Sequence, residues 1–132
     1  MGEWLRRFRL PLVWGVILLI SLQIGLLTPV IKGVLTDQGF AVLSSDAGHA
    51  GSLGPTFGID PQARLDYGYQ AVGKLTPMAK NVIRAAYTKG PDRSYFAGCS
   101  NGGRHAMIAA TRYAADYDGI LAGAPGYNLP KA

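Results

Sequence analysis

The sequence predicts an α/β protein in which strands and helices alternate in the order β-α-β-α-β around a parallel sheet, preceded by an apolar amino-terminal helix. Short apolar runs bounded by glycine or polar residues are typical of strands buried on both faces. Two longer segments between these runs repeat apolar residues every three or four positions, as amphipathic helices do. This alternation favours right-handed crossovers between parallel strands.

The composition limits the range of functions. The 132 residues are enough for one small domain, and the 18 glycines are scattered without a period. Much of the net charge of +5 comes from Arg6, Arg7 and Arg9, and no basic face with interleaved aromatic residues follows them. We therefore expect no nucleic-acid partner. No phosphate-cradling loop and no His/Cys cluster with metal spacing occurs, so no cofactor or metal site is expected in this chain.

The amino-terminal region combines basic residues with a long apolar run. Residues 10–30 are almost entirely apolar, form a run longer than a signal-peptide core, and are followed by no small-x-small cleavage site. This pattern favours residues 1–32 as a signal-like or membrane-anchor segment, which would place residues 33–132 outside the cytoplasm. A buried core helix and a misassigned start codon are the alternatives.

The first strand and the first helix follow this region. Residues 39–46 (GFAVLSSD) are a short apolar run that ends in a polar loop, which predicts a strand. Asp60 and Pro61 form an N-cap followed by proline at the first helical position, so a helix is expected to begin there. We expect Pro77 to kink this helix near residues 73–76. Its apolar stripe consists of Leu65, Tyr69, Val72, Leu75, Ala79, Val82, Ile83 and Ala86.

The remaining elements are shorter. Residues 93–99 (RSYFAGC) predict a second strand, residues 102–117 a second helix, and residues 119–125 (GILAGAP) a third strand.

The segment GCSNGG, residues 98–103, lies where the second strand meets the second helix. In this context G-x-S-x-G predicts a nucleophile elbow, in which Ser100 occupies a tight positive-φ turn between residues without side chains. The elbow glycines are Gly98, Gly102 and Gly103. The amino terminus of the helix faces any oxyanion formed there, and we expect the Asn101 N–H to be its first donor. A plain glycine-rich turn is the alternative.

A serine nucleophile needs a histidine base and a carboxylate that orients it. In the chain order typical of such an elbow, both follow the serine on later strands. His105 lies on the same helix as the elbow and is predicted to be structural. His49 precedes the serine, so it is a candidate for lining the site and a poor one for the base. Asp116 and Asp118 are expected at the polar end of a helix and in a turn.

Cys99 is the only cysteine in the sequence and directly precedes Ser100. Because it lies one residue off the tip of the turn, we expect its side chain to point into the sheet, which disfavours a thiol nucleophile. It is either a small buried hydrophobic residue or half of a disulfide whose partner lies outside this chain.

Four segments together resemble the tannase/feruloyl esterase family of serine hydrolases, which have the α/β-hydrolase fold. They are GFAVLSSDAGHAG, DPQARLDYGYQAV, RSYFAGCSNGGRHAM and YDGILAGAP. The resemblance implies an exported esterase of phenolic esters such as gallate or ferulate, with Ser100 as the nucleophile. It also implies a disulfide from Cys99 to a cysteine beside the catalytic histidine, and a lid domain that often holds a structural calcium ion.

The resemblance covers only part of such an enzyme. The acid, the histidine and the lid would all follow Ala132, so residues 33–132 are expected to be a partial α/β-hydrolase domain, inactive alone. Similarity to the family begins near residues 25–35 and so overlaps the apolar run. The same residues cannot both cross lipid and support a hydrolase sheet. The competing functions are a non-catalytic membrane-anchored protein and half of a split esterase completed by a downstream chain.

Overall fold

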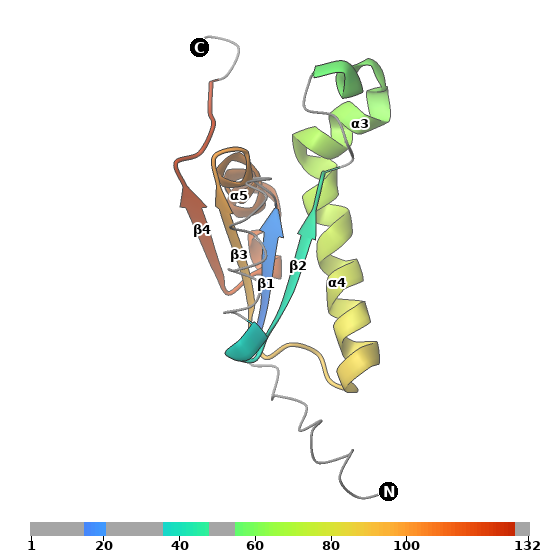
Figure 1. Ribbon diagram of the computed structural model, residues 1–132, viewed down its shortest axis with the longest axis vertical. Coiled ribbons are helices and arrows are strands. Elements are labelled where there is room, and N and C mark those ends of the chain that lie inside the picture. The colour runs from blue at the N-terminus through green and yellow to red at the C-terminus, as the bar shows by residue number, and fades with distance from the viewer. Residues whose placement is uncertain (1–14, 21–35, 48–54, 129–132) are drawn as a thin grey trace, which may run out of the picture.

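Parallel strands form the single sheet of the computed structural model, which describes residues 15–20, 36–47 and 55–128. The strands are β1 (Gly15–Ile20), β2 (Phe40–Ser45), β3 (Ser94–Cys99) and β4 (Gly119–Gly123). Their order across the sheet is β2-β1-β3-β4, and every neighbouring pair is parallel (Figure 1). The carboxyl ends of all these strands therefore lie at one edge, and the predicted α/β class with a parallel sheet is confirmed.

Strand β1 corrects the interpretation of the apolar run. Gly15 to Ile20 pair with Phe40 to Ser45 on one side, and Val16 to Leu19 pair with Ser94 to Ala97 on the other. The expected apolar helix is thus wrong for residues 15–20, because a central strand of a sheet cannot also be part of a membrane-spanning helix. Residues 10–14 and 21–30 of the run lie outside the described residues. In the described part of the chain, no helix has the length and apolar character needed to cross a bilayer.

The connection from β2 to β3 contains a helix with an irregular segment. After η1 (Pro55–Ile59), α3 (Pro61–Leu65) begins as predicted: the Asp60 carboxylate accepts a hydrogen bond from the Gln62 N–H at 2.8 Å. A π-helical turn, η2 (Asp66–Gln70), then leads into α4 (Ala71–Tyr87). Helix α4 runs without interruption through Pro77, and the departure from α geometry lies earlier, in η2. The kink expected near residues 73–76 stays a prediction.

The connection from β3 to β4 contains α5 (Asn101–Arg112) and a short 3₁₀ turn, η3 (Ala114–Asp116). The helix is shorter than the predicted 102–117, because Tyr113 leaves the helical region with φ −133°. The strand that follows is Gly119–Gly123, as expected for this part of the sequence.

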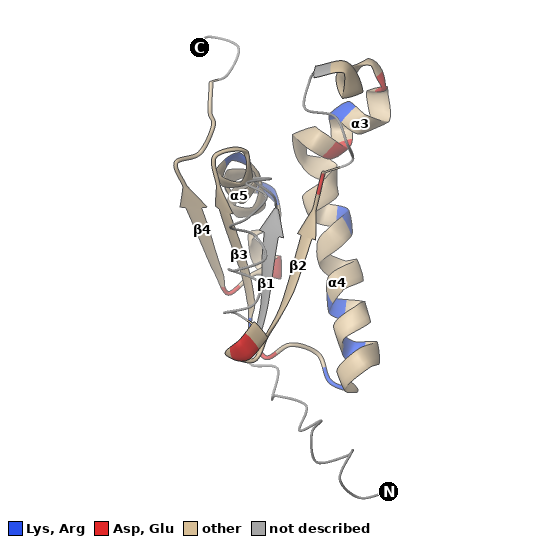
Figure 2. Ribbon diagram, viewed as in Figure 1, with Lys and Arg blue, Asp and Glu red and all other residues tan. Residues whose placement is uncertain are grey.

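Helices α4 and α5 cover the same face of the sheet. The core cluster consists of Val72, Phe96, Ala106 and Ala109, with Leu43, Leu75, Tyr113, Tyr117 and Ile120 packed against it. Since Val72 comes from α4 and Ala106 from α5, both helices pack against Phe96 of β3. Figure 2 shows that charged residues lie on the helices and beyond the strand ends; β2, β3 and β4 contain none.

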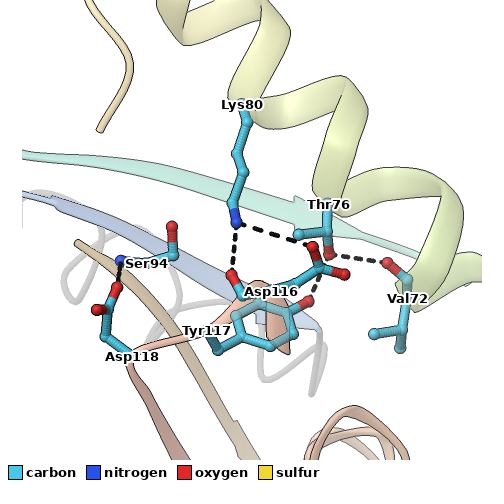
Figure 3. Close-up of polar contacts among 7 residues, drawn as sticks. All are labelled: Val72, Thr76, Lys80, Ser94, Asp116, Tyr117 and Asp118. Carbon is cyan, nitrogen blue, oxygen red and sulfur yellow. Dashed lines mark hydrogen bonds and ion pairs between the residues drawn. The ribbon is translucent and has the colours of Figure 1, made fainter. Parts of the chain in front are cut away.

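Asp118 joins β3 and β4 at the amino-terminal edge of the sheet (Figure 3). Its N–H donates to the Ser94 carbonyl at 2.7 Å, and its carboxylate accepts from the Ser94 N–H at 2.8 Å. The other carboxylate oxygen lies 2.8 Å from the Arg93 guanidinium. Arg93 and the Ser94 N–H together hold the pKa of Asp118 below its ordinary value.

Tyr117 and Lys80 join the same corner to α4 (Figure 3). The Tyr117 hydroxyl is hydrogen-bonded to the Thr76 hydroxyl, which in turn donates to the Val72 carbonyl at 2.8 Å. Burial raises the pKa of Tyr117 to about 12. Lys80 donates to the Asp116 carbonyl at 2.5 Å. These contacts fix the start of β4 against the helix.

The Asp118 contacts predict a pH-dependent stability. Because folding lowers the pKa of this carboxyl, its contribution is present above the unfolded pKa of about 4 and is lost as the pH falls through the folded value. We expect Asp118→Asn to lower the urea midpoint at pH 7 and to converge with the wild type near pH 2.5. The control is Asp92→Asn, which removes an exposed ion pair with Lys89. A constant difference between wild type and D118N across this pH range would contradict the assignment.

Candidate active site

Ser100 occupies the turn between β3 and α5, at the carboxyl edge of the sheet. Strand β3 ends at Cys99 and α5 begins at Asn101, so a single residue reverses the chain direction. Ser100 has φ 56° and ψ −115°, a conformation that residues other than glycine rarely adopt. Such strain persists only where the surroundings enforce it, and it concentrates at functional sites. The residue is exposed.

The elbow glycines allow this turn by close backbone contact. A Cβ on Gly98 would lie 2.1 Å from the Gly102 carbonyl oxygen, and a Cβ on Gly103 would lie 2.4 Å from that of Gly123. Real Cβ atoms do not approach backbone oxygen so closely, so β3, α5 and β4 meet only because side chains are absent here. Gly102 and Gly103 are both buried.

Strand β4 and the residues after it hold Ser100 from the other side. The Ser100 N–H donates to the Gly123 carbonyl at 3.0 Å, and the Ser100 carbonyl accepts from the Gly126 N–H at 3.0 Å. The same carbonyl accepts the Arg104 N–H at 3.0 Å, as the first bond of α5. The strained backbone is therefore fixed at both its N–H and its carbonyl group.

Asn101 is the first residue of α5. The first N–H groups of an α-helix have no intrahelical acceptor, and the helix dipole places partial positive charge at this end. The Asn101 N–H directly follows the serine, which is the position of the first oxyanion donor in a nucleophile elbow.

A polar network that the sequence analysis missed surrounds Asn101. Its side-chain oxygen accepts from the Tyr67 hydroxyl at 2.9 Å and from Arg104 Nε at 3.0 Å. Arg104 Nη2 also donates to the Tyr67 carbonyl at 2.7 Å, within the π turn η2. Tyr67 and Arg104 are 37 positions apart, so no local spacing links them. The one available signal was that each lies in a segment resembling the family.

His105, Asp116 and Asp118 form hydrogen bonds with groups other than Ser100. His105 is fully buried in α5, with its Nε2 atom 2.9 Å from Arg104 Nη2 and its ring edge-on to Tyr67, in keeping with a structural role. Asp116 and Asp118 lie at the opposite edge of the sheet, beside a cavity of about 290 Å³. His49 lies outside the described residues.

Cys99 is an exposed free thiol, so the buried alternative is wrong.

The calcium site implied for the lid has no counterpart among the described residues. No three His, Cys, Asp or Glu side chains in that part of the chain come together as a metal-ligand cluster.

Comparisons with known proteins agree with this geometry. The family model for tannase and feruloyl esterase matches residues 7–131. The chain belongs to this family. The match includes β1, in agreement with its place in the sheet.

Similar proteins are named as a hydrolase and an esterase. Mono(2-hydroxyethyl) terephthalate hydrolase from Piscinibacter sakaiensis is 44% identical over 104 residues, which cover 73% of this chain and 17% of that protein. A probable feruloyl esterase B-2 from Neosartorya fischeri is 37% identical over 91 residues, covering 69% of this chain and 17% of its own length. This tannase-family chain therefore spans 17% of the length of either relative.

A solved structure supports the fold. The crystal structure of an esterase from Aspergillus oryzae superposes with a TM-score of 0.76 at 26% identity, covering 90% of this chain and 24% of the other. The tannase-family chain thus has the strand and helix arrangement of part of an esterase fold.

The glycine contacts predict that adding one methyl group lowers the free energy of unfolding strongly. Gly98→Ala is expected to destabilise the protein by about 3 kcal/mol, because the new Cβ would overlap the Gly102 carbonyl and neither backbone can yield. Urea denaturation measures this. The matched control is Gly68→Ala, whose Cβ would meet nothing within 4 Å. Equal effects of the two substitutions would refute the close contact.

The positive φ of Ser100 predicts a local cost in stability. Ser100→Gly is expected to stabilise the protein by about 1 kcal/mol, because glycine adopts φ 56° without strain. Ser100→Ala removes the same hydroxyl and keeps the strain, so its stability should match the wild type. Thermal melts of the three proteins test this, and a glycine variant no more stable than the alanine variant would contradict it.

Proposed function

We propose that this chain carries the nucleophile of a serine carboxylic ester hydrolase. The observation that carries the proposal is the strained, exposed Ser100 at the junction of β3 and α5, held by glycine contacts that exclude side chains. An ordinary glycine-rich turn would have no reason to place serine, instead of glycine, at φ 56°.

The reaction begins with attack of the Ser100 hydroxyl oxygen on the ester carbonyl carbon. A histidine takes the hydroxyl proton as the new C–O bond forms, and the carbonyl oxygen becomes an oxyanion that accepts a hydrogen bond from the Asn101 N–H. Collapse of this intermediate breaks the bond to the alcohol, which leaves with the proton, and the acyl group stays on Ser100. Water then repeats the sequence to release the acid.

The histidine and carboxylate of this proposal come from residues outside the sequence. His105 is buried against Tyr67, and Asp116 and Asp118 are bound at the far edge of the sheet. Each relative named above is several times longer than the segment it shares with this chain, which leaves room for such residues. The proposal therefore includes a larger esterase of which this chain is a segment, with its lid and acid/His region elsewhere.

The proposed substrates are small esters of aromatic acids, including phenolic esters such as gallate or ferulate. The names of the two relatives support this class, since terephthalate and ferulate esters both place an aromatic acyl group on the carbonyl that the serine attacks. His49, which follows β2 in the sequence, is proposed to line the site.

The proposal also gives Cys99 a partner. Cys99 is proposed to form a disulfide with a cysteine next to the catalytic histidine, and its exposed thiol beside Ser100 supports this. Such a bond requires an oxidising compartment, so the enzyme is proposed to be exported.

The test is hydrolysis of ethyl ferulate and mono(2-hydroxyethyl) terephthalate by the native polypeptide that contains Ser100. Ser100→Ala is expected to lower kcat at least about 10³-fold. Thr111→Ala, which removes a hydroxyl bound to the Met107 carbonyl on the same helix, should leave kcat unchanged. The polypeptide's intact mass should exceed the 14.0 kDa of this chain. Full activity of the S100A variant, or a native mass of 14.0 kDa without turnover, would refute the proposal.

A further inference from the structure

Arg104 is a half-buried cation beside the elbow. Burial lowers the pKa of its guanidinium from the ordinary value, although the group remains protonated near neutral pH. Removing a charge from water is costly unless hydrogen bonds replace the lost solvation. The partners of Arg104 therefore explain why the residue lies here.

Those partners come from two separate parts of the chain. In η2, the Tyr67 carbonyl accepts from Nη2 at 2.7 Å, the Gly68 carbonyl from Nη1 at 3.4 Å, and the Tyr67 ring lies 4.2 Å below the guanidinium carbon. In α5, the side-chain oxygen of Asn101 accepts from Nε at 3.0 Å, and His105 Nε2 lies 2.9 Å from Nη2. Since a guanidinium only donates, His105 Nε2 is the acceptor of this bond.

Asn101 is held by both halves of this arrangement. Its side-chain oxygen accepts hydrogen bonds from Arg104 and from the Tyr67 hydroxyl. Arg104 in turn donates to the Tyr67 carbonyl and stacks on the Tyr67 ring. The three residues form a closed ring of contacts. The side chain of the residue that carries the proposed oxyanion donor thus cannot turn away without breaking two hydrogen bonds.

We propose that Arg104 is a positioning residue of the active site: with Tyr67 it fixes Asn101, and through Asn101 it aligns the first N–H of α5 with the oxyanion formed at Ser100. This inference rests on the proposed esterase function. Oxyanion donors act because they are aligned before the reaction, so a small displacement lowers kcat more than it changes substrate binding.

The positive charge of Arg104 also favours an oxyanion at the start of α5. Among the described residues no carboxylate lies within ion-pair distance of it, and all of its hydrogen-bond acceptors are neutral. Its positive charge therefore adds to the dipole at the amino terminus of α5, where negative charge develops during the reaction.

The chain contains a matched control. Arg112, at the other end of α5, lies over the ring of Tyr69, with 4.5 Å between the guanidinium carbon and the ring centre. Both pairs join α5 to η2 by an arginine over a tyrosine, but Arg112 is exposed and lies at the far end of the helix from Ser100. A role in general helix packing would affect both pairs, whereas a positioning role affects only the first.

The experiment compares Arg104→Lys with Arg112→Lys in the complete native polypeptide. Lysine keeps the charge but cannot donate in a planar fork to Asn101 and the Tyr67 carbonyl at once. We expect R104K to lower kcat about 10- to 100-fold with KM within about twofold, and R112K to change neither. In an Asn101→Ala background, R104K should lower kcat by less than about twofold further, because Arg104 acts through that side chain. An unchanged kcat in R104K, or the same loss in both backgrounds, would overturn the inference.

A second readout is independent of turnover. The side-chain amide resonances of Asn101 in ¹⁵N-labelled protein should shift and broaden in R104K and stay unchanged in R112K. Unchanged Asn101 resonances in R104K would overturn the inference, whether or not the wild type hydrolyses esters. Failure of the esterase proposal has a different signature, because an S100A variant would then be as active as the wild type.

Discussion

Contact between backbone atoms at the junction of β3 and α5 is the constraint on which the site depends. Gly98 and Gly102 approach so closely that a methyl group on Gly98 would overlap the Gly102 carbonyl. A strand and a helix joined at this distance leave one residue to complete the turn, and that residue must accept a positive φ. The strain at Ser100 is therefore a consequence of packing, and the packing depends on glycine.

The two edges of the sheet differ in the contacts that their side chains make. At the amino-terminal edge, Asp118 forms an ion pair with Arg93 and a hydrogen bond with Ser94. The Tyr117 hydroxyl is hydrogen-bonded to Thr76 of α4, so the charged and polar groups there have partners. At the carboxyl edge, α5 presents free N–H groups and Arg104 has no carboxylate partner among the described residues. Contacts of side-chain carboxylates thus gather at the amino-terminal edge, and the guanidinium of Arg104 lies beside Ser100 at the other.

The π turn η2 links these observations to the rest of the fold. It interrupts the helical connection from β2 to β3 beside the elbow, where its carbonyl groups and the Tyr67 ring receive Arg104. Single π turns inside helices recur at functional sites. Here the turn brings a segment that precedes β3 into contact with Asn101, the residue that follows Ser100.

The sequence by itself determined the elements whose signals are local. The tight turn was predicted from Gly98, Ser100 and Gly102, and the start of α3 from Asp60 and Pro61. Short apolar runs predicted three of the strands. These signals are local because capping, turn geometry and periodicity act over a few residues. Only the tertiary structure decided that residues 15–20 form a strand. An apolar run suits a central strand and a membrane helix equally, and pairing with β2 and β3 distinguishes them. The ring of Tyr67, Asn101 and Arg104 likewise depends on contacts between distant segments, which no local spacing encodes.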